Sequence, residues 1–126
     1  MKVFVSDRNP TVQERLISIL ALIAGTEIVS RNDPALSVAE AIERLGPDVA
    51  LFDVWPGVMG ELQQLREMKA ANHGPVIILL IDEPFLHTLY TRTKLLKGGA
   101  DFVFQPSYQF EDVRKLIEEM SRGNHR

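Results

Sequence analysis

Residues 75–81 read PVIILLI, and every position after the proline is apolar. Short apolar runs that follow a turn residue are typical of strands buried on both faces, because neither face needs a polar residue for water. Such strands occur in parallel sheets that helices cover on both sides. This stretch therefore predicts an inner strand of a parallel sheet in an α/β domain.

The same alternation of strand and helix patterns extends from this run to both ends of the chain. Further short apolar runs predict strands at residues 3–5, 27–29, 48–52 and 101–104. Apolar residues at spacings of three and four predict helices over residues 10–24, 33–45, 60–71, 84–97 and 110–120. Strands and helices in strict alternation require right-handed crossovers, which place helices on both faces of the sheet. The sequence thus predicts a doubly wound, three-layer α/β/α domain with a five-stranded parallel sheet.

Residues with special backbone preferences mark the expected helix ends. Asn9–Pro10 fits the N-cap and first turn of the first helix, and Gly25 fits its end. Asp33–Pro34 fits the start of the second helix, and Gly46–Pro47 its end. Within residues 84–97 we expect four core positions, which are Phe85, Leu89, Leu95 and Leu96.

Length and composition restrict the classes of protein that fit. The 126 residues carry 14 Lys+Arg against 17 Asp+Glu, a net charge of −3, and no cysteine. This predicts one domain over residues 1–121 and a polar tail over residues 122–126. The scattered basic residues argue against nucleic acid, and the missing cysteines exclude thiol catalysis and cysteine-ligated zinc. With no membrane-length apolar run and no secretory leader at Met1, we expect a cytoplasmic protein without a membrane partner.

Acidic side chains follow two of the expected strands. Asp7 comes after the first strand and Asp53 after the third. In parallel sheets, ligand sites lie beyond the carboxyl ends of the strands, so these two carboxylates are expected to face one crevice. Oxygen ligands of this kind suit a hard cation such as Mg²⁺. The alternative is that each aspartate only caps a turn.

Other chemistries find little support in the residues. No glycine-rich phosphate loop follows the first strand, which argues against a dinucleotide or a nucleoside triphosphate. The histidines at 73, 87 and 125 lack metal-ligand spacing, and no serine lies in a nucleophile elbow. We therefore expect no enzyme.

Four segments, at residues 6–10, 47–53, 75–81 and 98–106, together resemble the receiver domains of two-component response regulators. They read SDRNP, PDVALFD, PVIILLI and GGADFVFQP, and they follow one another at the family's spacing over nearly the whole chain. The resemblance implies the flavodoxin-like strand order 2-1-3-4-5.

The resemblance also implies roles for particular residues. Asp53 stands at the position that accepts a phosphoryl group from a histidine kinase, a phosphotransfer protein or a small acyl phosphate. Asp7 and the backbone carbonyl of Trp55 stand where the family binds Mg²⁺, which is the implied cofactor. Phe102 stands at the position of the aromatic switch residue in the fifth strand.

The sequence departs from the family at the same pocket. Alignment on the proline of SDRNP puts Arg8 at the second acidic position, which predicts impaired metal binding. A rival alignment puts Ser6 and Asp7 at the two acidic positions, but it needs an extra residue before Pro10. Leu80 replaces the hydroxyl residue, and Gln105 replaces the lysine. The loop after the phosphoacceptor position reads DVWP, which places its proline one residue early. Loss of one preorganised donor typically costs about 2.7–4 kcal/mol of transition-state stabilisation, so phosphotransfer is expected to be slow or absent.

Arg8 suggests a more specific hypothesis. Its guanidinium could pair with one of the strand-end carboxylates and take the place of the cation, which would lock the pocket without magnesium. The alternative is that Arg8 points into solvent.

Three functions remain open from the sequence. The first is a receiver that is phosphorylated at Asp53 and signals to a downstream protein. The second is a degenerate pseudo-receiver that binds partners without phosphorylation, and the third is a flavin or nucleotide carrier of the same topology. The expected partner surface is the fourth helix, fifth strand and fifth helix, with exposed aromatic residues within 84–97 and a possible homodimer through this face.

Overall fold

The structure is a computed structural model of the chain, and it describes residues 1–30, 35–53, 60, 63–67, 74–81 and 89–123, with the side chains of 89–91 and 106–108 excepted. The strands are β1 (Lys2–Ser6), β2 (Glu27–Val29), β3 (Val49–Asp53), β4 (Val76–Leu80) and β5 (Phe102–Phe104). All paired strands are parallel, and their order in the sheet is β2-β1-β3-β4-β5. The predicted sheet and strand order are confirmed.

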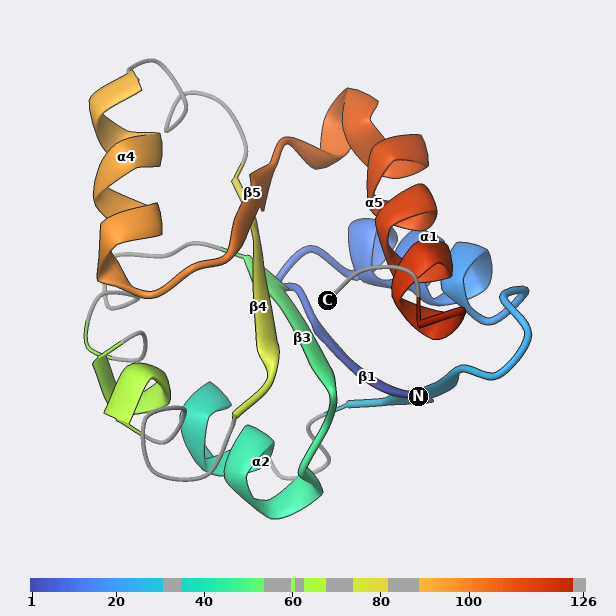
Figure 1. Cartoon of the computed structure of the whole chain (residues 1–126), viewed down its shortest axis with the longest axis horizontal. Helices are drawn as coiled ribbons and strands as arrows, with labels where there is room; N and C mark the ends of the chain where they lie inside the picture. Colours follow the sequence, from blue (N-terminus) through green and yellow to red (C-terminus); the bar gives the residue numbers. More distant parts are fainter. Residues whose placement is uncertain (31–34, 54–59, 61–62, 68–73, 82–88, 124–126) are drawn as a thin grey trace.

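Helices cover both faces of this sheet. They are α1 (Pro10–Leu20), α2 (Val38–Leu45), α4 (Leu89–Gly98) and α5 (Pro106–Ser121), and residues 63–67 are also helical. Figure 1 shows α1 and α5 side by side on one face, with α2 and α4 on the other. The three-layer prediction is therefore confirmed. None of the helices within the described ranges is long and apolar enough to cross a membrane.

The core is split in two by the sheet, as the alternation of side chains along a strand requires. Phe4, Phe52 and Leu79 pack with α2 and α4, whereas Val5 and Leu51 pack with α1 and α5. Inner strands therefore bury apolar residues on both faces, which explains why residues 76–80 contain no polar residue.

The first helix begins as predicted and ends earlier. The Asn9 side-chain oxygen accepts hydrogen bonds from the backbone N–H of Thr11 at 3.0 Å and of Val12 at 3.4 Å, so Asn9 is the N-cap. The predicted end at Gly25 is wrong, because α1 ends at Leu20. The Thr26 hydroxyl donates to carbonyls left open at this end, including that of Leu20 at 3.1 Å, so the chain turns there.

The predicted start of the second helix is also wrong. Residues 33–34 lie outside the described residues, and α2 begins at Val38 after the N-cap Ser37. Ser37 and Glu40 form a capping box, in which each side chain accepts a hydrogen bond from the other's backbone N–H. Gly46, with φ of 59°, ends the helix as predicted.

Two expectations for the later helices need correction. Leu95 is buried, but Leu96 is 38% exposed, because successive helical residues cannot share one face. Phe85 and the side chain of Leu89 lie outside the described residues. The last helix extends further toward the N-terminus than the predicted core positions: α5 begins at Pro106, a residue favoured in a first turn, and its backbone leaves the helical region at Gln109, just before Phe110.

Candidate functional site

The carboxyl ends of the two neighbouring strands β1 and β3 carry the candidate site. Ser6 of β1 lies beside Phe52 of β3 in the sheet register, so Asp7, just after β1, follows on beside Asp53, the last residue of β3. The crevice predicted at this edge is thus formed by adjacent strands, as expected for a doubly wound sheet.

Arg8 and Asp53 form an ion pair across this crevice. The Nε–H of Arg8 donates to Oδ2 of Asp53 at 2.7 Å. The Asp53 side chain is only 15% exposed, whereas the Arg8 side chain is 60% exposed. The carboxylate therefore sits mostly inside the protein while its cation reaches it from the surface. The pair that the sequence suggested between these residues is present.

Asp7 forms hydrogen bonds with residues that follow it in the chain. Its Oδ1 accepts a hydrogen bond from the backbone N–H of Asn9 at 2.8 Å, and its own N–H donates to Oε1 of Gln13 at 3.0 Å. These contacts match the turn-capping alternative for Asp7. Beside them is a hollow of about 220 Å³, lined by Val5, Ser6, Asp7, Arg8, Gln13 and Ser30.

The residues at this site do not match the donor set that a divalent cation needs. Mg²⁺ is held by carboxylates and other oxygen ligands. Within the part of the chain that the structure describes, no group of three or more His, Cys, Asp or Glu residues gathers to hold a metal ion. One oxygen of Asp53 already bonds to the guanidinium of Arg8. Trp55, whose carbonyl was the further expected ligand, lies outside the described residues.

Leu80 lies next to Asp53 across the β3–β4 pairing. Its side chain is 1% exposed and belongs to the core on the α1 and α5 side, with Val113 and Ile117. The place beside the carboxylate is therefore filled by a packed apolar side chain that offers no hydrogen bond.

Gln105 and Phe102 lie at the neighbouring strand end. Gln105 is 5% exposed and precedes α5, where its backbone N–H donates to Oε1 of Gln109 at 2.6 Å. Phe102 is partly buried against the α1 and α5 side of the core, and its ring stacks on that of Phe104 with centroids 6.3 Å apart. Sequence reasoning missed the roles of Gln13 and Gln109, although a glutamine shortly after each strand end was the available signal.

Comparison with known proteins shows related chains and related folds. No protein-family model matches the sequence. The probable transcriptional regulatory protein NarL of Mycobacterium tuberculosis is 29% identical over 122 residues, which cover 94% of this chain and 54% of that protein. The response regulator GacA of Pseudomonas aeruginosa is 25% identical over 126 residues, which cover 98% of this chain and 56% of that protein.

Solved structures agree with these relatives. The signal receiver domain of the putative response regulator NarL from Mycobacterium tuberculosis matches with a TM-score of 0.74 and 23% identity, covering 97% of this chain and 96% of that one. The chain is therefore similar to response-regulator receiver domains over nearly its whole length. A second solved structure, of an atypical orphan response regulator, matches with a TM-score of 0.70 and 14% identity, covering 97% of this chain and 96% of that one.

The chain spans about half the length of the curated relatives named above. A protein-glutamate methylesterase/protein-glutamine glutaminase of Rhizobium etli is 30% identical over 78 residues, but these cover only 22% of that protein. The similarity to this enzyme is therefore limited to a minor part of its chain.

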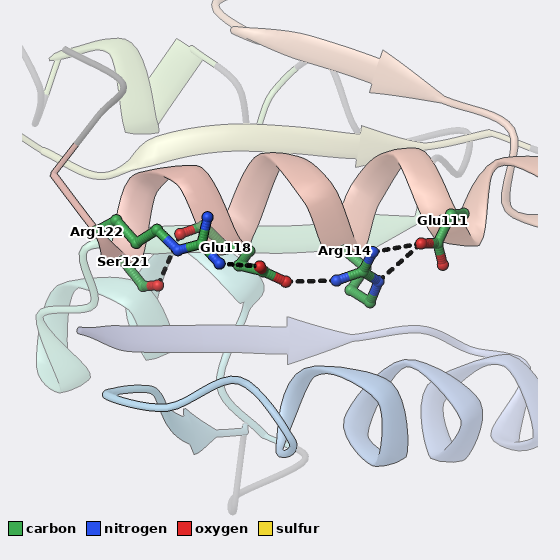
Figure 2. Close-up of polar contacts among 5 residues, drawn as sticks. All are labelled: Glu111, Arg114, Glu118, Ser121 and Arg122. Atoms are coloured by element: carbon green, nitrogen blue, oxygen red, sulfur yellow. Dashed lines mark hydrogen bonds and ion pairs between the residues drawn. The ribbon is translucent and has the colours of Figure 1, made fainter.

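A second charged region lies along α5 (Figure 2). Arg114 pairs with Glu111 and with Glu118, and Glu118 also pairs with Arg122. The hydrogen bond from Arg114 lowers the pKa of the exposed Glu111, and the same bond raises the pKa of Arg114. The spacings of three and four between these residues are the sequence signal for such pairs.

Proposed function

We propose that this receiver domain is a relay in two-component signalling, with Asp53 as its phosphoacceptor and protein contact as its output. The carrying observation is the position of Asp53, a carboxylate at the carboxyl end of an inner strand with 15% of its side chain exposed. A histidine kinase or phosphotransfer protein is the proposed donor, and a downstream protein the proposed receiver of the signal.

The chemistry is nucleophilic attack by a carboxylate. An oxygen of Asp53 forms a bond to phosphorus, the bond from phosphorus to the donor's oxygen or nitrogen breaks, and the donor group leaves with that electron pair. Charge builds up on the phosphoryl oxygens, so donors and cations around Asp53 set the rate. Leu80 offers none beside the carboxylate, and Gln105 provides a neutral amide where the family has an ammonium group. We therefore expect slow transfer.

A second candidate function is a pseudo-receiver that binds its partner without phosphorylation. The Arg8–Asp53 ion pair supports this candidate, because it gives the carboxylate a cationic partner in the absence of any phosphoryl group. The atypical orphan response regulator of similar fold is described as having a phosphorylation-independent regulatory mechanism.

For either candidate, we propose the face formed by α4, β5 and α5 as the partner or homodimer surface. Residues 84–88 and the side chain of Tyr90, from the segment where exposed aromatic groups are expected, lie outside the described residues. Leu96 of α4 contributes an exposed apolar side chain to this face.

Treatment with a small acyl phosphate followed by intact-mass measurement tests the main candidate. We expect one phosphoryl group on a fraction of the wild-type protein and none on Asp53→Asn. An adduct that persists in Asp53→Asn, or no adduct on the wild type, would overturn the role of Asp53 as phosphoacceptor. The second result would favour the pseudo-receiver.

A further inference from the structure

We propose that Arg8 is the resident cation of the receiver pocket and takes the place of a divalent metal at Asp53. The inference rests on the proposed function in one respect, since it takes Asp53 as the carboxylate on which the site acts. The observation behind it is the 2.7 Å hydrogen bond from Arg8 Nε to Asp53 Oδ2, between residues 45 positions apart in the chain.

The burial of Asp53 makes this pair more than a surface contact. Ion pairs between fully exposed groups contribute little, because water screens both charges. Here the carboxylate is 15% exposed, so much of its surroundings is protein, and its charge is less screened. A guanidinium at hydrogen-bond distance supplies positive charge where a metal would otherwise be needed.

The backbone that carries Arg8 is held on both sides. Asp7 is fixed by the bond from its N–H to Gln13, and Asn9 is fixed both by its N–H bond to Asp7 and by its capping of α1. Arg8 lies between these two anchored residues, so its side chain starts from a defined position at the crevice. The fold thus fixes the point from which the Arg8 side chain extends to Asp53.

The same arrangement excludes a divalent cation. A metal at Asp53 would have to displace the guanidinium from Oδ2 and then remain close to its positive charge. Asp7, the other carboxylate of the crevice, already accepts the N–H of Asn9 at Oδ1. Binding of Mg²⁺ at Asp53 therefore costs the ion pair with Arg8.

Three substitutions at position 8 separate charge from shape. Arg8→Asp removes the cation and restores the acidic pair of the family. Arg8→Ala removes the cation alone. Arg8→Lys keeps the charge but not the planar fork of donors, and serves as the matched control.

The deciding experiment is a titration of each protein with Mg²⁺, followed by its thermal unfolding midpoint. A ligand that binds only the folded state raises this midpoint as its concentration rises. We expect no rise for the wild type and Arg8→Lys, a saturable rise for Arg8→Asp, and a weaker one for Arg8→Ala. A saturable rise in the wild type that Asp53→Asn abolishes would overturn the proposal, as would no rise in either Arg8→Ala or Arg8→Asp. If Arg8→Asp does not fold, Arg8→Ala decides.

Acyl-phosphate treatment in EDTA and in Mg²⁺ separates this inference from the proposed function. An adduct on Asp53 that forms at the same rate in both buffers supports both. An adduct that needs Mg²⁺ overturns the resident cation and leaves the phosphoacceptor role intact. If no adduct forms in either buffer, the phosphoacceptor role fails, and the Mg²⁺ titration still decides the role of Arg8.

Discussion

The charged groups at the strand ends and those on α5 form ion pairs of two different kinds. Arg8 and Asp53 are 45 positions apart and meet only because β1 and β3 are neighbours in the sheet. The α5 pairs join residues three or four positions apart on one helix, and Glu111 and Arg122 are 63% and 62% exposed. The first pair depends on the tertiary fold, and the second series would be possible on any exposed helix.

The two kinds of ion pair differ in how strongly each carboxylate depends on its cationic partner. Exposed helical pairs contribute little, because solvent competes for both partners. A carboxylate that is mostly withdrawn from water depends much more on its partner. The strand-end pair should therefore govern a functional property of the protein, whereas the α5 series should adjust stability slightly.

The largest expected effect is that of Arg8→Ala. It leaves the carboxylate of Asp53 mostly buried without its guanidinium, and we expect a loss of about 1–2 kcal/mol in the free energy of unfolding at pH 7. Urea denaturation measures this loss. Arg8→Lys should retain part of the stability. If Arg8→Ala is as stable as the wild type, the strand-end ion pair is no stronger than the ion pairs on α5, and the comparison fails.

Asn9→Ala should cost about 1 kcal/mol, because it removes the oxygen that caps the first turn of α1. It also loosens the segment that carries Arg8, so the loss from a subsequent Arg8→Ala change should shrink. Urea denaturation of the single and double variants checks both points. Asn9→Ser, which can still cap the helix, is the control and should behave like the wild type.

Glu118→Gln should have a smaller effect, about 0.3–0.5 kcal/mol, although it weakens the pairs with both Arg114 and Arg122. Urea denaturation at low salt and at high salt tests this. Glu118 is 29% exposed, so we expect this loss to shrink at high salt, whereas the loss from Arg8→Ala should shrink less because Asp53 is 15% exposed. Equal salt dependence of the two losses would contradict the comparison.

The smallest effect is expected for Glu111→Gln, and it should depend on pH. Arg114 lowers the pKa of Glu111 in the folded state, so the pair stabilises the protein above the ordinary carboxyl pKa. This contribution is lost as pH falls through the lowered pKa. The difference between the unfolding midpoints of wild type and Glu111→Gln should be small at pH 7 and vanish in acid; a difference that grows in acid would contradict the assigned shift.

Much of the fold could be predicted because hydrophobic periodicity reports directly which face of each element is buried. The alternation of strand and helix patterns along the chain predicted the parallel sheet. The resemblance to receiver domains implied the order of its strands. Helix ends were less predictable, since Ser37 competes with Asp33–Pro34 as a start signal and only its capping box with Glu40 decides. Leu95 and Leu96 show the same limit, because both are apolar and only one can face the core.

At the candidate site, the location of the residues in the fold could be predicted more readily than the hydrogen bonds between their side chains. Strand ends identified Asp7, Arg8 and Asp53, since parallel strands present their carboxyl ends at one edge. Which oxygen each donor reaches depends on side-chain placement across the sheet, which the sequence left open between Arg8 pairing and Arg8 pointing into solvent. The shortened loop through Trp55 and the aromatic switch role of Phe102 stay predictions.

A double-mutant cycle on Arg8 and Asp53 tests the central claim most directly. Urea denaturation at pH 7 would compare the wild type, Arg8→Ala, Asp53→Asn and the double variant. Urea is uncharged, so it does not screen the ion pair. We predict that the losses are not additive, with a coupling free energy of about 1 kcal/mol or more. Losses that add to within about 0.3–0.5 kcal/mol would show that the two residues are independent, and would contradict Arg8 as the cation of the strand-end site.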